Sequence, residues 1–139
     1  MFLLRSIISF VFLLSFLKIA HADELKLFLM KFSDAKKYPY HLLDDNYRAY
    51  FQTGDYTLVL NKQQLKEMYD EQSKITEQIE LKNFRILSRS DSENYTSVTY
   101  QYNWNAKIGN TNMNGVLSSH TTLIKDGETW KVIFDAVTQ

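Results

Sequence analysis

Residues 94–106, NYTSVTYQYNWNA, alternate between two kinds of side chain with a period of two. Successive side chains of a β-strand point to opposite faces of the sheet, so this pattern predicts a strand with one face toward the core. The set expected to face the core is Thr96, Val98, Tyr100, Tyr102 and Trp104. The set expected to face outward is Ser97, Thr99, Gln101 and Asn103.

Extended segments are predicted on both sides of this strand. Residues 79–89 form one, with an irregularity at Asn83-Phe84, where the alternation changes phase. Residues 113–125 and 128–138 form two more, joined at Asp126-Gly127, a strong two-residue hairpin signal. The apolar row of the last strand is expected to be Trp130, Val132, Phe134 and Ala136.

The first part of the mature chain is predicted to be mainly helical. Apolar residues recur at spacings of three and four in 23–38, which Pro39 ends, and in 41–52. A short strand is expected at 56–60, and Asn61 is a good N-cap for a third helix over 62–73.

Helices followed by strands indicate an α+β fold rather than a parallel βαβ sheet. We expect a strongly curved, mostly antiparallel sheet wrapped around the N-terminal helices. Because the long strands are apolar on one side, this sheet should leave a cone-shaped cavity.

Residues 1–22 have the pattern of a secretory signal peptide. Arg5 supplies the early positive charge, residues 7–17 are almost entirely apolar, and Ala20-His21-Ala22 fits a cleavage site. The alternative is an uncleaved anchor, but the apolar run is short for a membrane span. We therefore predict an exported protein, periplasmic or secreted and from a bacterial source, with a single domain over residues 23–139.

Composition argues against several classes of function. The chain has 16 basic and 16 acidic residues without a basic stripe, which argues against nucleic-acid and anionic-membrane partners. It has no cysteine, so thiol chemistry and disulfides are excluded. No paired histidine spacing and no glycine-rich phosphate loop occur, so we expect neither a metal nor another cofactor.

Three stretches resemble the nuclear-transport-factor-2-like superfamily, which includes the SnoaL-like polyketide cyclases and the ketosteroid isomerases. They are residues 47–51 (YRAYF) followed by Gly54-Asp55, the helix before the long strands, and the closing residues 126–132 (DGETWKV). The resemblance covers essentially the whole mature domain. It implies the cone-shaped fold and, in some members, a homodimer through the outer face of the sheet. That face should carry Ser97, Thr99, Gln101 and Asn103, with Tyr95 at its end.

Aromatic residues with polar tips are the candidate ligand-binding residues. We expect Tyr100, Tyr102 and Trp104 to meet Tyr47 and Tyr50 in the cavity, with His120 on a neighbouring strand. His120 could act there as an acid or base, or could be an ordinary sheet histidine. Asp135 is expected to point away from the cavity, because it lies on the face opposite Trp130. No catalytic constellation can then be assembled.

These observations leave three functional hypotheses. The first is an exported binding module that holds a flat apolar small molecule or a protein partner without turnover. The second is a small-molecule isomerase or cyclase, which the resemblance implies. The third is a periplasmic subunit of a secretion apparatus. A buried carboxylate touching a tyrosine hydroxyl would favour the enzyme, and a pocket lined by aromatic rings would favour the module.

Overall fold

The computed structural model describes residues 24–34 and 36–139. The predicted signal peptide lies outside these residues. Within them, a helix over residues 24–32 comes first. The later elements are η1 (Tyr40–Leu42), β1 (Leu43–Thr53), β2 (Tyr56–Asn61), α2 (Lys62–Ile75), β3 (Thr76–Asp91), β4 (Tyr95–Ile108), β5 (Thr111–Asp126) and β6 (Thr129–Thr138).

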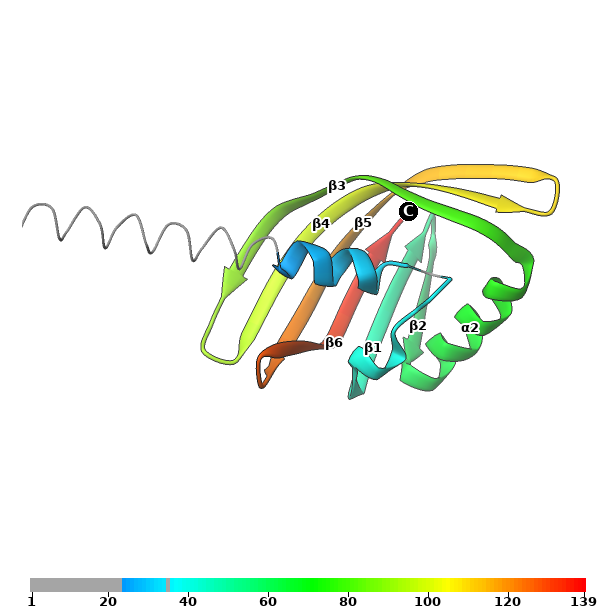
Figure 1. Ribbon diagram of the computed structural model, residues 1–139. Helices are drawn as coiled ribbons and strands as arrows, with labels where there is room; N and C mark the ends of the chain where they lie inside the picture. Colours follow the sequence, from blue (N-terminus) through cyan, green and yellow to red (C-terminus); the bar gives the residue numbers. More distant parts are fainter. Residues whose placement is uncertain (1–23, 35) are drawn as a thin grey trace, which may run out of the picture.

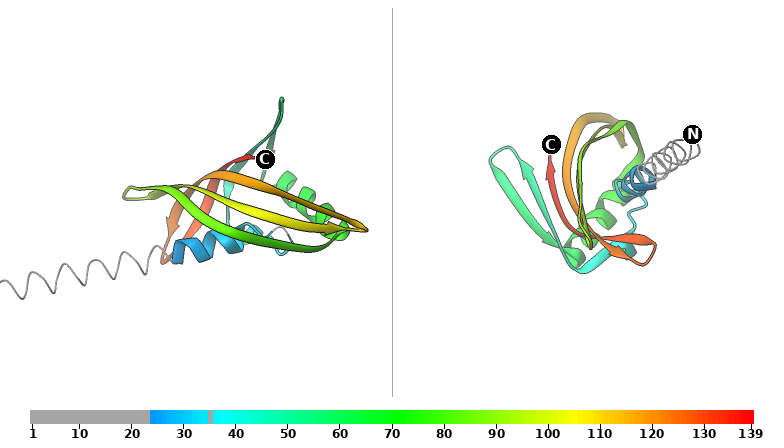
Figure 2. Two further views of the ribbon diagram at one scale, coloured as in Figure 1. Left: turned by 90° about the horizontal axis from the view of Figure 1, so that it is seen from above. Right: turned by 90° about the vertical axis from the view of Figure 1, so that its left-hand side faces the viewer.

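The strands form a six-stranded sheet in the order β2-β1-β6-β5-β4-β3. Strands β3 to β6 form the predicted antiparallel meander, and β1 pairs with β6 in parallel. The sheet is strongly curved, and the helix over 24–32 lies on its concave face (Figures 1 and 2). This arrangement confirms the expected α+β fold class.

An irregularity in β3 lies where the sequence predicted one. Asn83 has a positive φ of 54°, and the register between β3 and β4 shifts between Lys82 and Arg85. Such irregularities bend a strand and increase its twist, so this one contributes to the curvature of the sheet.

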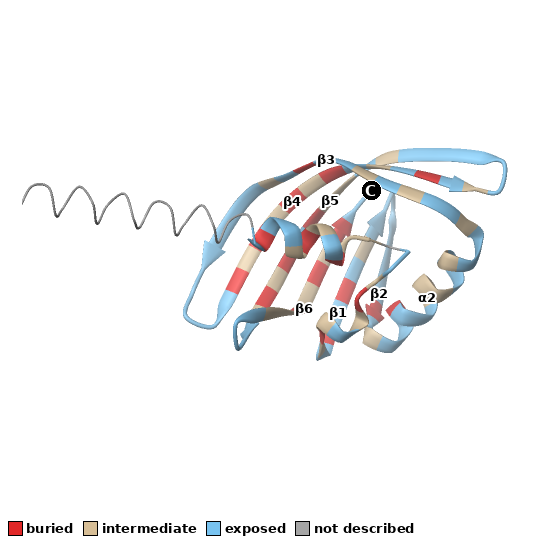
Figure 3. Ribbon diagram, in the orientation of Figure 1, coloured by how far each residue is buried: buried red, intermediate tan, exposed pale blue. Residues whose placement is uncertain are grey.

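The concave face carries the core, and buried residues alternate mainly with half-buried ones along the central strands (Figure 3). On β4 the buried residues include Val98, Tyr100 and Tyr102, as the alternation predicted. Leu25 and Leu29 of the first helix are fully buried against this face. Burial of this apolar surface holds the helix on the sheet.

The predicted second helix over residues 41–52 is wrong: this segment is η1 followed by strand β1. Leu43 and Tyr47 are compatible with a helical period, but Tyr47, Ala49 and Phe51 alternate inward as a strand requires. Ala49 pairs with Asp135 of β6, and β1 also pairs with β2. Pairing on both sides supplies backbone hydrogen bonds that local propensity did not reveal.

The first helix is shorter than the predicted 23–38, since it ends at residue 32. Asp34 Oδ1 accepts hydrogen bonds from the backbone N–H groups of Lys36, at 3.1 Å, and Lys37, at 3.4 Å. An aspartate side chain that binds nearby backbone N–H groups stabilises a turn and competes with helix. The chain therefore turns before Pro39, and Tyr38 reaches the core as part of this turn.

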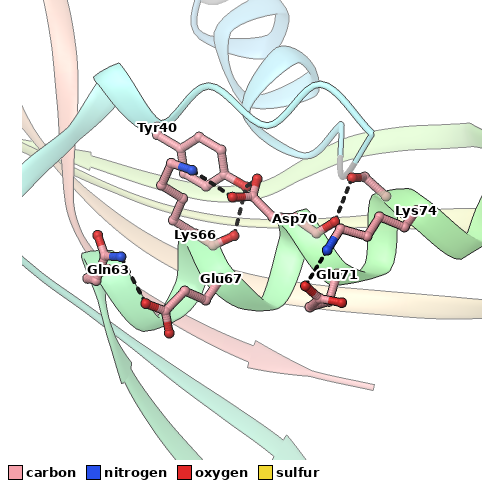
Figure 4. A network of polar contacts seen from close by, with 8 residues as sticks. Tyr40, Gln63, Lys66, Glu67, Asp70, Glu71 and Lys74 are labelled. Carbon is pink, nitrogen blue, oxygen red and sulfur yellow. Dashed lines mark hydrogen bonds and ion pairs between the residues drawn. The ribbon is translucent and has the colours of Figure 1, made fainter.

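Helix α2 begins where the sequence predicted. Asn61 Oδ1 accepts from the Gln64 N–H at 2.9 Å, and Gln64 Oε1 accepts from the Asn61 N–H at 3.0 Å, which completes a capping box. On the outer side of α2, the Tyr40 hydroxyl donates to Asp70 at 3.2 Å, and Lys66 pairs with Asp70 (Figure 4). These contacts join α2 to η1.

Candidate functional site

An outer chamber of about 290 Å³ lies between α2, the end of the first helix and strands β3 to β5. Its lining is mostly apolar or aromatic. Residues that line it include Tyr69, Ile79, Leu81, Tyr102, Trp104, Ala106 and Leu117. Apolar lining with few polar groups is the usual composition of a small-molecule site, and this volume is at the small end of the range for such sites.

An inner recess of about 40 Å³ adjoins the outer chamber. Both spaces are lined by Ser33, Tyr69, Tyr102, Leu117 and Gln139, so they lie side by side, and together they are called the cavity below. Asp135 of β6 lines the recess but not the outer chamber. A mostly apolar chamber therefore lies next to a recess that contains a buried carboxyl group.

Hydroxyl groups of β5 hold the carboxyl group of Asp135. Asp135 Oδ1 accepts hydrogen bonds from the Ser119 hydroxyl and from the Thr121 hydroxyl, the latter at 2.5 Å. Thr121 Oγ1 is also hydrogen-bonded to the Tyr100 hydroxyl, at 3.3 Å. Burial raises the pKa of Asp135 to about 6, although both hydroxyl hydrogen bonds favour the charged form.

The expectation that Asp135 points away from the cavity is wrong, because β6 contains a bulge. Leu123 pairs with Val132, and the preceding Thr122 pairs with Phe134, so Ile133 is an extra residue on β6. One extra residue reverses the alternation of side chains beyond it. Val132 and Asp135 consequently share the concave face. Phe134 and Ala136 were expected to face the core, but they belong to the outward-facing row of β6.

Two groups of aromatic rings flank the cavity. On β3 and β4, Phe84 stacks on Tyr100 and on Tyr102, with interplanar angles of 22° and 9°. On the other side, Tyr38 stacks on Tyr69 of α2, with ring centroids 4.3 Å apart and an interplanar angle of 15°. Tyr69 and Tyr102 both line the chamber and the recess, so ring faces or edges border the space in both groups.

Tyr100, Tyr102 and Trp104 lie on the concave face as predicted, and Tyr102 and Trp104 line the outer chamber. Tyr100 lines the inner recess. Tyr47 is also on the concave side, but it is fully buried in the core and lines neither space.

Tyr50 and His120 do not face the cavity, which corrects both predictions. Tyr50 is on the convex face, 41% exposed, and its ring lies 5.3 Å from that of Phe134. Since β1 is a strand, Tyr47 and Tyr50 point to opposite faces. His120 is exposed, and its Nδ1 lies 2.9 Å from Thr99 Oγ1 on the convex face. It is therefore an ordinary sheet histidine.

Sequence reasoning missed five residues around the recess: Tyr38, Tyr69, Ser119, Thr121 and Asp135. Tyr69 had a usable signal, because it lies four residues after the buried Leu65 on the same helical face. Ser119 and Thr121 had none. The apolar pairs Val116-Leu117 and Leu123-Ile124 at both ends of that stretch fit either phase of alternation.

Among residues 24–34 and 36–139, no group of three or more histidine or acidic side chains is arranged to hold a metal ion. In the same part of the chain, no helix is long and apolar enough to cross a membrane.

The curved sheet, the helix on its concave face and the cavity beside that helix define a nuclear-transport-factor-2-like domain. The profile of the NTF2-like N-terminal transpeptidase domain family matches residues 35–137. The chain belongs to this family. No match was found among curated proteins.

Solved structures of the same fold share little sequence with this chain. A conserved protein from Planctomyces limnophilus is 16% identical with a TM-score of 0.65, covering 85% of this chain and 96% of its own. A ketosteroid isomerase-like protein from Erwinia carotovora atroseptica is 14% identical with a TM-score of 0.61, covering 86% and 92%. An NTF2-like protein of unknown function in nutrient uptake from Rhodospirillum rubrum is 17% identical with a TM-score of 0.57, covering 83% and 93%. At these identities the likeness concerns the fold alone.

Proposed function

We propose that this chain is an exported binding domain that holds a small, flat, mostly apolar molecule in its concave cavity without turnover. The observation that carries the proposal is the pair of adjacent spaces on the concave face, a mostly apolar chamber of about 290 Å³ and a recess of about 40 Å³. Aromatic side chains from β4 and α2 line this space, and aromatic rings pair favourably with one another in stacked or edge-on arrangements, which favours a flat ligand.

Absence of turnover is inferred from how the polar groups of the recess are engaged. One oxygen of Asp135 accepts from two hydroxyl groups, and the Tyr100 hydroxyl is bound to Thr121. Stabilisation of an oxyanion needs free donors that are aimed at it. The hydroxyl groups nearest to Asp135 are instead bound to one another or to Asp135.

Binding can be tested with 3-methylindole as a neutral flat probe, followed by NMR titration. Ala106→Phe adds a ring to the wall of the outer chamber, so we expect it to abolish binding. Val116→Phe adds the same ring at a position that is 51% exposed on the convex face, so binding should be unchanged. Equal binding by both variants would show that the probe does not enter the cavity.

A second candidate function is that of an isomerase or cyclase, because Asp135 is a buried acid in a cavity and has a raised pKa. A test is the exchange of α-carbon protons of 2-tetralone in D₂O, measured by NMR. A binding domain should leave the exchange at the buffer rate. Acceleration by the protein that disappears in Asp135→Asn would identify the chain as an enzyme and contradict binding without turnover.

A further inference from the structure

Asp135 is an acid without a basic partner among the described residues. Strand β5 contributes the neutral hydroxyl groups of Ser119 and Thr121. The titratable groups that act on it from other elements are tyrosines. They are Tyr47 from β1, Tyr100 and Tyr102 from β4, Tyr69 from α2 and Tyr38 from the turn before η1.

These tyrosines are neutral at physiological pH. Burial raises the pKa of Tyr102 to about 12 and raises the pKa of each of the other four further. The first helix contributes the apolar Phe32 to the recess. In residues 24–34 and 36–139, no ion pair includes Asp135.

A buried carboxylate without a cation is unfavourable, because hydroxyl donors replace only part of its hydration. The fold nevertheless maintains this group at the end of a cavity that a small molecule could enter. A ligand that brings a positive charge to Asp135 would supply the missing partner. A neutral ligand of the same shape would not.

The dimensions of the two spaces fit such a ligand. The recess, about 40 Å³, exceeds the roughly 10–15 Å³ that a cavity needs to hold one water molecule, so a head group as small as an ammonium fits into it. The outer chamber is about seven times larger and has aromatic walls. It has room for a ring system. The charged residue in its lining is Lys36, whose ammonium group donates to the backbone carbonyl of Glu77.

We propose that the ligand of this cavity is a flat aromatic molecule with a primary ammonium group, which pairs with Asp135 in the recess while the ring occupies the outer chamber. This inference rests on the proposed binding function and specifies the chemical class of its ligand. The ammonium donates to the carboxylate, and the ring packs against Tyr102 and Tyr69.

Three probes of similar size distinguish the ligand classes: tryptamine is cationic, 3-ethylindole is its neutral counterpart and indole-3-propionate is anionic. Affinities are measured by calorimetry at pH 7.5 and constant salt. We expect tryptamine to bind at least tenfold more tightly than 3-ethylindole and indole-3-propionate to bind most weakly. Asp135→Asn should bind 3-ethylindole as the unmodified protein does and lose the preference for tryptamine. Asp55→Asn removes an acid from the exposed β1–β2 turn and should keep the preference.

A second measurement does not depend on the folding of a variant. In the unmodified protein, the preference for tryptamine should shrink as the pH is lowered through about 6, where Asp135 becomes protonated. If 3-ethylindole binds as tightly as tryptamine, or the preference survives in Asp135→Asn, the ammonium inference is wrong and the binding function stands. If none of the three probes binds, the proposed binding function itself is contradicted.

Discussion

The indole of Trp104 on β4 lies directly over Gly115 on β5. The two residues are paired across the strands, and a Cβ atom at Gly115 would lie 2.9 Å from Trp104 Nε1. Real Cβ atoms do not approach other atoms this closely, so the absence of a side chain at residue 115 lets the indole lie flat on β5. The same indole lines the outer chamber, so this contact helps to set the shape of the cavity.

Gly115→Ala should therefore move the indole into the outer chamber. Overpacking of this kind costs about 1–3 kcal/mol of the free energy of unfolding, which exceeds the gain of about 0.4–1 kcal/mol from a stiffer unfolded chain. Urea unfolding measures the loss, and Trp104 emission in a Trp130→Phe background reports the movement. Asn114→Ala, at the exposed neighbouring position, is the control. Unchanged emission in Gly115→Ala would contradict the close contact.

Trp130 was expected to be a core residue, but it is only half-buried. Its ring packs edge-on against Phe28 of the first helix, with centroids 5.6 Å apart. We expect Trp130→Ala to cost about 1–3 kcal/mol, less than the roughly 3–5 kcal/mol typical of a fully buried tryptophan. Chemical denaturation of Trp130→Ala, Phe28→Ala and the double variant should give a coupling of about 0.5–1.5 kcal/mol. A coupling of zero would mean that the first helix is not held by this pair.

The stability of the domain should fall as the pH rises from about 4 to about 6. The pKa of Asp135 is 3.8 in the unfolded chain and about 6 in the folded one, so the folded state binds more protons in this interval. The stabilisation that the folded state gains from binding this proton is complete below pH 4 and is lost as the pH passes 6. It amounts to roughly 3 kcal/mol, as an upper estimate, since each pKa unit corresponds to about 1.4 kcal/mol.

Urea unfolding between pH 4 and pH 7 measures this effect. The Asp135→Asn variant provides the comparison, because it keeps the shape of the side chain and lacks the titration. Its stability should not show the decline between pH 4 and pH 6. The lowered pKa values of Asp45, Asp70 and Asp91 act at lower pH and are common to both proteins. Parallel curves for the two proteins would contradict the raised pKa of Asp135.

The exported protein should begin at Asp23. Ala20 and Ala22 fit the small-residue pattern that signal peptidase recognises, and the apolar run before them is short for a membrane span. Mass spectrometry of the protein recovered from the exported fraction should give the mass of residues 23–139. Ala22→Arg should block cleavage and leave the longer form. A product that still contains residues 17–20 in the absence of that substitution would favour an uncleaved anchor.

The domain should form a homodimer through the convex face of the sheet. Thr99 and Gln101 lie there, hydrogen-bonded to His120 at 2.9 Å and to Ser118 at 3.0 Å, and Tyr95 at its end is 49% exposed. Such a polar face predicts a modest, hydrated interface. Light scattering at micromolar concentration should give the dimer mass.

A charge introduced at the centre of that face should separate the two copies. Thr99→Arg should give the monomer mass, because the guanidinium would face the same region of the second copy, which carries the same charge. Leu27→Arg places the same charge on the first helix at a position that is 66% exposed, so it should leave the dimer intact. A monomer mass for the unmodified domain would exclude this mode of association.

The fold class and several element boundaries could be read directly from local patterns. The alternation over residues 94–106 predicted which face of β4 is buried, and the Asn61 cap lies where it was expected. The hairpin between β5 and β6 also formed, with its two-residue turn at Gly127-Glu128, one residue later than predicted. Each of these features depends on residues close together in the chain. The physical causes are side-chain alternation, turn geometry and a capping hydrogen bond. Each of them acts within a short window of sequence.

The rest depended on contacts between distant residues. Residues 43–53 fit a helical period, and pairing with β2 and β6 made them a strand, which sent Tyr47 and Tyr50 to opposite faces. The extra residue Ile133 on β6 turned Asp135 into the cavity, and only the pairing with β5 reveals it. The sequence by itself determined that a curved sheet with an aromatic concave face would form. Tertiary pairing decided that a carboxyl group lies at the end of its cavity, because a bulge changes the direction of a side chain without leaving a local signal.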